Sequence, residues 1–151
     1  MATLAGMTAM EYVVEALGGT GVFRGANEPT PDELRERINQ GLPYRSFESV
    51  RERLQLTMPE ASTVLRMPAR TLARRKQARR LDADESERLY RLVRVAAHAM
   101  AVFGSEDKVA AWLRRPNRAL NGEMPVALLD TDLGVRQVED VLGRLEYGLV
   151  G

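Results

Sequence analysis

The sequence contains no cysteine and only one histidine among its 151 residues. Without cysteine there is no disulfide and no thiolate metal site, which fits a reducing compartment, so we expect a cytoplasmic protein. Aromatic residues make up only 5% of the chain, so the core has to be built from Leu, Val, Ala and Met. The longest apolar stretch near the N-terminus, residues 12–17, is too short for a signal peptide or a membrane span. We therefore expect no membrane association.

Residue patterns typical of catalysis are equally scarce. His98 falls on the polar side of its expected helix, where a surface or interface position is more usual than a catalytic one. The glycine-rich residues 18–25 lack the Lys-Ser/Thr pair of a P-loop and follow no strand, so a loop is expected there. Acidic residues between 82 and 87 open a long helix, whose dipole explains them better than a metal site does. We expect no enzyme activity, no cofactor and no metal.

Apolar residues recur at spacings of three and four along almost the whole chain, which predicts an all-α fold. In the first half of the chain, helices are expected over residues 7–17 and from Thr30 to Gly41. The next three are expected from a cap at Ser46 through Leu54, from a capping box of Thr57 and Glu60 to Leu65, and from Pro68 to about Lys76. In the second half, helices are expected over residues 84–103, 106–113, 125–129 and 132–146.

Two of these helices are expected to supply large parts of the core. The helix over 84–103 carries one continuous apolar stripe that ends at Phe103. The last helix is expected to bury four apolar residues together with Leu145, and Gly148 is placed to terminate it. Trp112 is expected to anchor the C-terminal helices in the core, with an interface position as the alternative.

The net charge of +1 conceals an uneven distribution. Residues 1–34 carry a net charge of −4, residues 35–80 a net charge of +8, and residues 81–151 a net charge of −3. A basic middle between acidic flanks indicates one surface that faces a polyanion and other surfaces with different partners.

The basic segment has the pattern of a helix-turn-helix, with two short helices, a tight turn and an arginine-rich second helix. At about 100° per residue, Arg70 and Arg74 lie side by side while Leu72 points to nearly the opposite face. We predict base contacts from Arg70 and Thr71, and phosphate contacts from a second set: Arg74, Arg75, Lys76, Arg79 and Arg80. Binding to duplex DNA should then weaken steeply with salt. The alternative is a solvated basic face on a structural helix.

From Arg70 onward, an ordered series of short motifs resembles a known family. The series comprises Arg70-Thr71-Leu72-Ala73-Arg74-Arg75, Leu81 with Glu85-Ser86, Arg88-Leu89-Tyr90-Arg91-Leu92, Val102-Phe103-Gly104, Ala111-Trp112-Leu113 with Pro116-Asn117, Ala119-Leu120, Leu128-Leu129-Asp130-Thr131 and Glu146-Tyr147-Gly148. It is similar to the Xre-type antitoxins with a ParS/MbcA-like toxin-binding domain, which are partners of RES-domain toxins. The resemblance covers about residues 45–148, and the first forty residues match nothing in it.

This resemblance implies an architecture and a set of partners. The fold would be an Xre-like helix-turn-helix bundle followed by a small helical toxin-binding domain. Its parts would be an N-terminal segment at 1–44, a DNA-binding region at 45–82 and a toxin-binding domain at 83–151, with residues 84–103 as the linking helix. The family binds duplex DNA of its own promoter and a RES-type toxin that consumes NAD. It is commonly a homodimer within a larger toxin–antitoxin assembly.

The resemblance also implies that the C-terminal end blocks the entrance to the active site of the toxin. The blocking residues would be Tyr147, Gly148, Leu149, Val150 and Gly151, with polar contacts from Arg136 and Arg144. A short tail with two apolar residues and a free carboxylate is compatible with insertion into a cleft that accepts a nucleotide. The alternative is a frayed chain end without a role.

Two interpretations of the whole chain therefore remain open. The first is an antitoxin that neutralises a toxin and represses its own operon. The second is a stand-alone transcription regulator whose C-terminal domain dimerises or senses a signal. Both predict DNA binding, so only a partner protein separates them. The N-terminal segment would either extend a dimer interface or pack over the helix-turn-helix.

Overall fold

A computed structural model describes residues 6–148, which form an all-α fold, as the spacing of apolar residues predicts. The helices are α1 (Ala9–Ala16), α2 (Pro31–Gln40), α3 (Tyr44–Arg53), α4 (Met58–Leu65), α5 (Ala69–Ala78), α6 (Ala83–Phe103), α7 (Glu106–Leu113) and α8 (Asp132–Glu146). Short 3₁₀ turns cover Thr20–Phe23, Arg118–Leu120 and Pro125–Leu128. Within residues 6–148, extended pairing is limited to two isolated bridges, Pro43 with Arg80 and Asn117 with Glu123.

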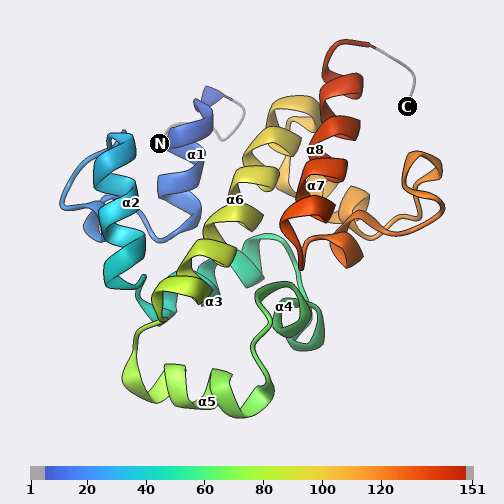
Figure 1. Cartoon of the computed structure of the whole chain (residues 1–151). Coiled ribbons are helices and arrows are strands. Elements are labelled where there is room, and N and C mark those ends of the chain that lie inside the picture. The colour runs from blue at the N-terminus through green and yellow to red at the C-terminus, as the bar shows by residue number, and fades with distance from the viewer. Residues whose placement is uncertain (1–5, 149–151) are drawn as a thin grey trace.

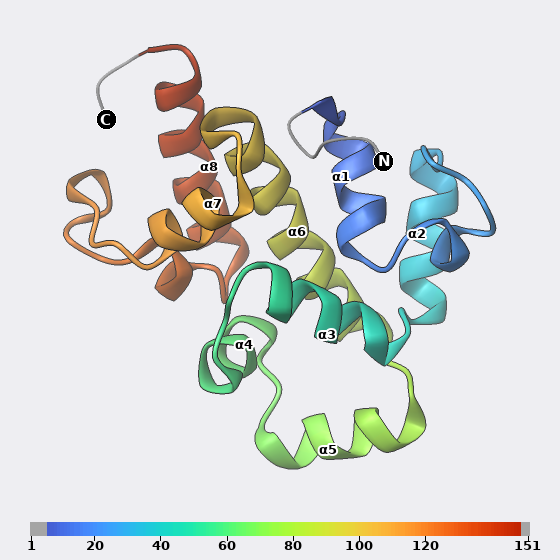
Figure 2. The same cartoon turned by 180° about the vertical axis from the view of Figure 1, so that it is seen from behind.

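The long helix α6 runs through the centre of the molecule, as Figures 1 and 2 show. Helices α1 and α2 cover one side of α6, and α7 and α8 cover the other. Helices α3 and α4 lie across its N-terminal half, and α5 spans the end of the molecule opposite the last turns of α8. This arrangement buries α6 on several sides, so its buried residues include Ser86, Val95 and Ala99 beside the expected apolar stripe. Phe103, at the end of that stripe, is only partly buried.

Side-chain caps begin most of these helices, because the first amides of a helix have no partner within it. Thr57 Oγ1 accepts a hydrogen bond from the Glu60 amide at 3.2 Å, and Glu60 Oε1 accepts one from the Thr57 amide at 2.8 Å. The capping box predicted for these two residues is therefore confirmed. Asp82 and Glu85 form an equivalent box at the start of α6.

The prediction that Ser46 caps a helix is wrong. Helix α3 already begins at Tyr44, after Pro43, and Ser46 is fully buried one turn inside it. Its hydroxyl donates to the Leu17 carbonyl at 2.5 Å, and the Ser49 hydroxyl donates to the Ala16 carbonyl at 2.7 Å. These carbonyls belong to the C-terminal end of α1, where the helix itself offers no donor. Ser46 therefore serves the end of a different helix, a contact that local sequence does not reveal.

Two further expectations about burial need correction. Residues 18–25 are not a plain loop, because the turn Thr20–Phe23 buries Val22 and Phe23 against α1 and α2. Leu145, expected in the core, is 37% exposed. Trp112 is buried next to Phe103, with ring centroids 5.5 Å apart, in agreement with its expected role as a core anchor.

The N-terminal helices are integral parts of the core. Buried side chains form one continuous cluster from Tyr12 in α1 to Leu142 in α8. The Tyr12 hydroxyl donates to Glu106 Oε2 at 2.9 Å, and Arg53 pairs with Glu15 at 3.1 Å. The N-terminal segment thus packs over α6 and α3, and it is tied to α7 through Glu106.

A second polar joint connects α4 with the segment after α7. Arg114 donates to Glu60, with Nη2 at 2.6 Å from Oε1 and Nε at 3.3 Å from Oε2, and it also bonds the Gln55 carbonyl. Burial opposes the charged form of Glu60, but hydrogen bonds from Arg114 and Thr57 lower the pKa of its carboxyl below the ordinary value. The joint is therefore strongest when Glu60 is ionised.

We expect the variant Arg114→Gln to be less stable than the wild type at neutral pH, by up to about 1 kcal/mol. The difference should shrink as the pH falls below about 4, the ordinary range of a glutamate, because a protonated Glu60 no longer depends on the guanidinium. Thermal unfolding followed between pH 7 and pH 3.5 measures this. Arg115→Gln, at the exposed neighbouring position, is the matched control. A difference between wild type and Arg114→Gln that stays constant over this range would contradict the prediction.

Candidate functional site

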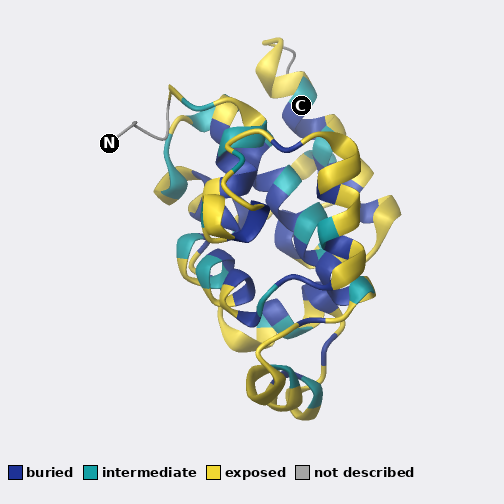
Figure 3. Ribbon diagram, turned by 90° about the vertical axis from the view of Figure 1, so that its left-hand side faces the viewer, coloured by how far each residue is buried: buried dark blue, intermediate teal, exposed yellow. Residues whose placement is uncertain are grey.

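Helix α5 projects from the bundle and is held mainly at its two ends. Of residues 69–78, Leu72 is the one that is buried. The turn before α5 is closed by the Met67 amide, which donates to the Ser62 carbonyl at 2.9 Å. After α5, the Tyr44 amide donates to the Arg79 carbonyl at 3.0 Å, and the Leu81 amide donates to the Leu42 carbonyl at 2.9 Å. Figure 3 shows this end of the molecule as largely exposed.

The basic residues singled out from the sequence gather on this helix. Exposed side chains around one shallow depression include Arg70, Arg74, Lys76 and Arg79, together with Ala73 and Gln77. Arg80 is exposed directly after them, and Thr71 is half-buried on the flank of the helix. The residues that line the depression include no carboxylate. This surface is suited to a polyanion, and the contacts of its individual residues with DNA stay predictions.

Arg75 differs from its basic neighbours because its guanidinium is already paired. Its Nε lies 2.7 Å from Glu85 Oε1, and its Nη2 lies 3.1 Å from Asp82 Oδ2. The hydrogen bond to Glu85 is the main cause of the raised pKa of Arg75. Since the Glu85 side chain is only 6% exposed, this ion pair fastens α5 to the first turn of α6. Arg75 was predicted to contact phosphate, but the structure places it in this internal joint.

We expect Arg75→Gln to lower the free energy of unfolding by about 1–3 kcal/mol, because Glu85 loses its charged partner in a buried position. Affinity for duplex DNA should fall, because α5 is no longer held in its orientation. The slope of log K against log salt should stay unchanged, whereas a lost phosphate contact would reduce it by about 0.9. Fluorescence anisotropy over a salt series measures both quantities.

Lys76→Gln is the control for this prediction, because Lys76 is exposed on the same helix. It should reduce the salt slope and leave the unfolding free energy unchanged. Equal changes of slope in both variants would assign Arg75 to phosphate binding after all.

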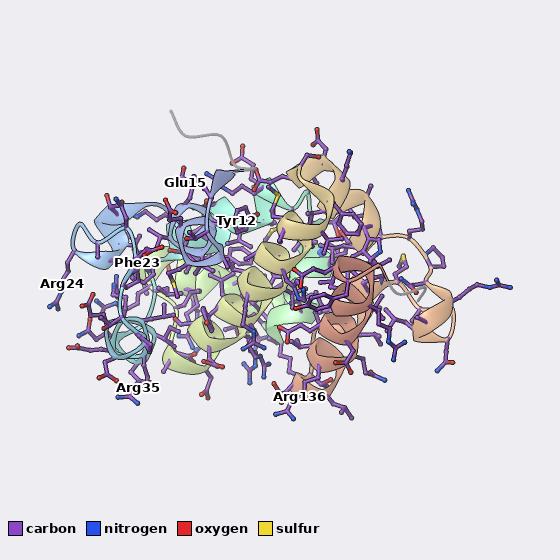
Figure 4. The ribbon with its side chains drawn as sticks, turned by 90° about the horizontal axis from the view of Figure 1, so that it is seen from above. Tyr12, Glu15, Phe23, Arg24, Arg35 and Arg136 are labelled. Carbon is purple, nitrogen blue, oxygen red and sulfur yellow. The ribbon has the colours of Figure 1, made fainter. Side chains whose placement is uncertain are left out.

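A second candidate surface lies on α8, whose C-terminal end is at the opposite end of the molecule from α5 (Figure 1). The predicted residues Arg136, Arg144 and Tyr147 are exposed on one face of this helix, and Gly148 follows them. Figure 4 shows Arg136 pointing away from the bundle, where it also pairs with Asp132 at 3.1 Å. The predicted residues Leu149, Val150 and Gly151 lie outside the described part of the chain.

Leu133 is a residue of this face that sequence analysis missed. Its side chain is 71% exposed, and Tyr147 at the other end of the face is 79% exposed. Both apolar side chains are available for contact with a partner. The signal was available, since Leu133 falls on the polar side of the helix, opposite Val138 and Leu142. The apolar spacing of this helix marks the residues that face the core, and Leu133 is not one of them.

The described residues hold little that supports chemistry. His98 Nε2 lies 3.7 Å from Glu146 Oε1, in a contact between α6 and α8. Within residues 6–148, no group of three or more His, Asp or Glu side chains is placed to hold a metal ion. In the same range, no helix combines the length and apolarity needed to cross a bilayer. What the arrangement offers is two separate binding surfaces.

Comparison with known proteins assigns these surfaces to two adjoining domains. Residues 33–94 match the family described as the antitoxin Xre-like helix-turn-helix domain. Residues 98–148 match the antitoxin Xre/MbcA/ParS C-terminal toxin-binding domain.

The chain is also similar to curated proteins over most of its length. A protein named Antitoxin Xre from Photorhabdus laumondii is 34% identical over 115 residues, which are 75% of this chain and 78% of that protein. A protein of the same name from Pseudomonas putida is 35% identical over 77% of this chain and 72% of its own length. A third, from Yersinia enterocolitica, is 32% identical over 77% of this chain and 80% of its own length.

Proposed function

The chain belongs to the Xre family of antitoxins, and from this membership we propose that it blocks the active site of a RES-type toxin that consumes NAD. The resemblance to Xre-type antitoxins with a ParS/MbcA-like C-terminal domain, drawn from the ordered motifs, is confirmed. The family and its helix-turn-helix point to a regulator, and we infer that the protein acts by covering surfaces and catalyses no reaction. The RES type of the toxin and its NAD substrate are part of the proposal.

The observation that carries the proposal is the exposed face of α8. It lies within the match to a toxin-binding domain and presents Leu133 and Tyr147 at its two ends. Fourteen residues of helix separate these side chains by about 21 Å. A partner would cover both and would face Arg136 and Arg144 between them. In this proposal the steric occlusion comes from Tyr147 and Gly148, at the C-terminal end of this face, together with residues 149–151.

The second part of the proposal is binding to the promoter of the protein's own operon through α5. The exposed basic side chains of α5 supply the attraction to phosphates that such binding requires. A homodimer would place two copies of α5 on the two halves of a palindromic site, as helix-turn-helix proteins commonly do.

The last turns of α8 and helix α5 lie at opposite ends of the molecule, whereas the first turn of α8 lies beside the N-terminal half of α6, where Asp132 is 3.9 Å from Arg91. Helix α6 has 21 residues and therefore spans about 31 Å between the end near α5 and the end near the last turns of α8. Toxin bound at the last turns of α8 would not cover α5 of the same chain. We therefore propose that the toxin-bound protein still binds DNA, so that the pair represses its operon together.

Co-expression with the product of the neighbouring gene tests this function. We expect a stable complex that survives purification, and its mass gives the stoichiometry. Leu133→Asp should weaken the complex, whereas Asn39→Asp, at an exposed position of α2, is the control for an added charge. A complex that forms equally well with both variants would remove the α8 face from the proposal. A chain that purifies alone would contradict the toxin assignment itself.

A further inference from the structure

Three side chains of α5 form a row that points away from the rest of the molecule. Measured from the buried Leu72 at 100° per residue, Gln77 lies at about 140°, Arg70 at about 160° and Arg74 at about 200°. All three are exposed, and all three line the same shallow depression. They form the outermost ridge of the helix, which is the ridge that approaches the floor of a groove when a helix enters DNA.

We propose that this row reads base edges in the major groove, with Arg70 and Arg74 selecting guanine and Gln77 selecting adenine. The inference rests on the proposed DNA binding and specifies what that surface recognises. An arginine fork donates two hydrogen bonds to O6 and N7 of guanine, and a glutamine amide pairs with N6 and N7 of adenine. The sequence did not predict a role for Gln77, because the signal for DNA binding was positive charge and Gln77 is neutral.

The internal contacts of the helix support the assignment of Arg70 and Arg74. Arg75 is held by Glu85 and Asp82. Among residues 6–148, no carboxylate lies within ion-pair distance of Arg70 or Arg74, so neither has to give up a partner to bind a base. Thr71, predicted to contact bases from its place in the first turn, is half-buried about 100° away from Arg70 around the helix.

Gln77 carries no charge on a helix that is otherwise strongly basic. It therefore adds nothing to the general attraction for phosphates. Because Gln77 is exposed on the outer ridge, its side-chain amide can contact a base directly. Lys76 and Arg79 lie closer to the side of the bundle, where long cationic side chains reach the phosphates at the rim of a groove.

The spacing of the row sets the length of the site that it reads. Arg70 and Arg74 are about 6 Å apart along the helix axis, and Arg70 and Gln77 are about 10.5 Å apart. With about 3.4 Å between successive base pairs, these separations correspond to at most about two and three base-pair steps, because a helix in the groove is inclined to the DNA axis. The expected half-site is therefore short, with two guanines about two base pairs apart and an adenine close to the second.

Selection from a random duplex library tests this assignment with the full chain. The wild type should enrich a short motif with guanines and one adenine. Gln77→Ala should lose the preference for adenine at one position, with discrimination falling on the order of tenfold, while the guanine positions stay. Gln77→Glu should replace adenine by cytosine at that position, because a carboxylate accepts from N4 of cytosine. Arg70→Ala should remove one guanine.

Lys76→Gln is the control, and it should weaken binding to all duplexes by a similar factor without changing the motif. All three positions, Arg70, Lys76 and Gln77, are exposed, so these variants should fold as the wild type does, and circular dichroism checks this. A motif that is unchanged in both Gln77 variants would overturn the assignment while leaving DNA binding in place. A wild type that binds no duplex would overturn the proposed DNA binding together with it.

Discussion

Deletion of residues 147–151 is expected to abolish the protection that this protein gives to cells expressing its toxin. The proposal places these residues in the entrance of the toxin active site. NAD in cells expressing both proteins should then fall to the level seen with the toxin alone. NAD measured after induction of the toxin gives the result directly.

Binding and blocking should separate in this deletion. The buried residues of α8, from Val135 to Leu142, remain in the truncated chain, so its helices should melt as those of the full chain do. The exposed face from Leu133 to Arg144 also remains, so the truncated protein should still co-purify with the toxin, with weaker affinity. Full protection by the truncated protein would exclude the chain end as the blocking element.

The same substitution at two glycines of α8 is expected to change stability in opposite directions. A Cβ on Gly134 would lie 1.8 Å from the Leu128 carbonyl oxygen and 2.8 Å from the Leu128 carbonyl carbon. Because both atoms are backbone, the turn Pro125–Leu128 and α8 would have to separate. Gly134→Ala should lower the free energy of unfolding by about 3 kcal/mol or more. For a chain of this length the melting temperature would fall by about 6–12 °C.

Gly143 is the matched control in the same helix. A Cβ there meets nothing within 4 Å, and alanine is the better helix former by about 1 kcal/mol. Gly143→Ala should therefore raise the melting temperature slightly. Urea or thermal unfolding of the two variants measures the difference, and a fall of equal size in both would contradict the close approach at Gly134. The packing at Gly134 also fixes the start of α8, and with it the position of Leu133.

Much of the fold follows from signals that lie within a few residues of each other. Thr57 with Glu60 marks the start of α4, and the apolar spacing in residues 132–146 marks α8 together with most of its buried side. The arginines of α5 and the sharp turn before it indicate a helix-turn-helix in the same way. Such signals are readable because capping bonds and helix periodicity join residues three or four positions apart.

The sites were less predictable, since each depends on what a side chain meets from a distant part of the chain. Arg75 has the same chemistry as Arg74 and was assigned to DNA with it, yet Glu85 pairs with it from the start of α6. Ser46 looked like a cap for its own helix and instead bonds the end of α1. Leu133 lies on the face that α6 does not cover, and no feature of residues 132–146 alone shows where α6 will lie.

From its amino acids alone this protein is recognisable as a helical antitoxin with a basic helix-turn-helix, because helix signals, charge and motif order are written along the chain. Packing around α6 decides which arginines are free to bind DNA. It also decides which helix bonds the C-terminal end of α1 and which face of α8 stays exposed. That packing brings together residues 10 to 94 positions apart, such as Arg75 with Glu85 and Tyr12 with Glu106. Contacts of this kind leave no local pattern in a sequence, because their energy comes from burial and pairing across the folded chain.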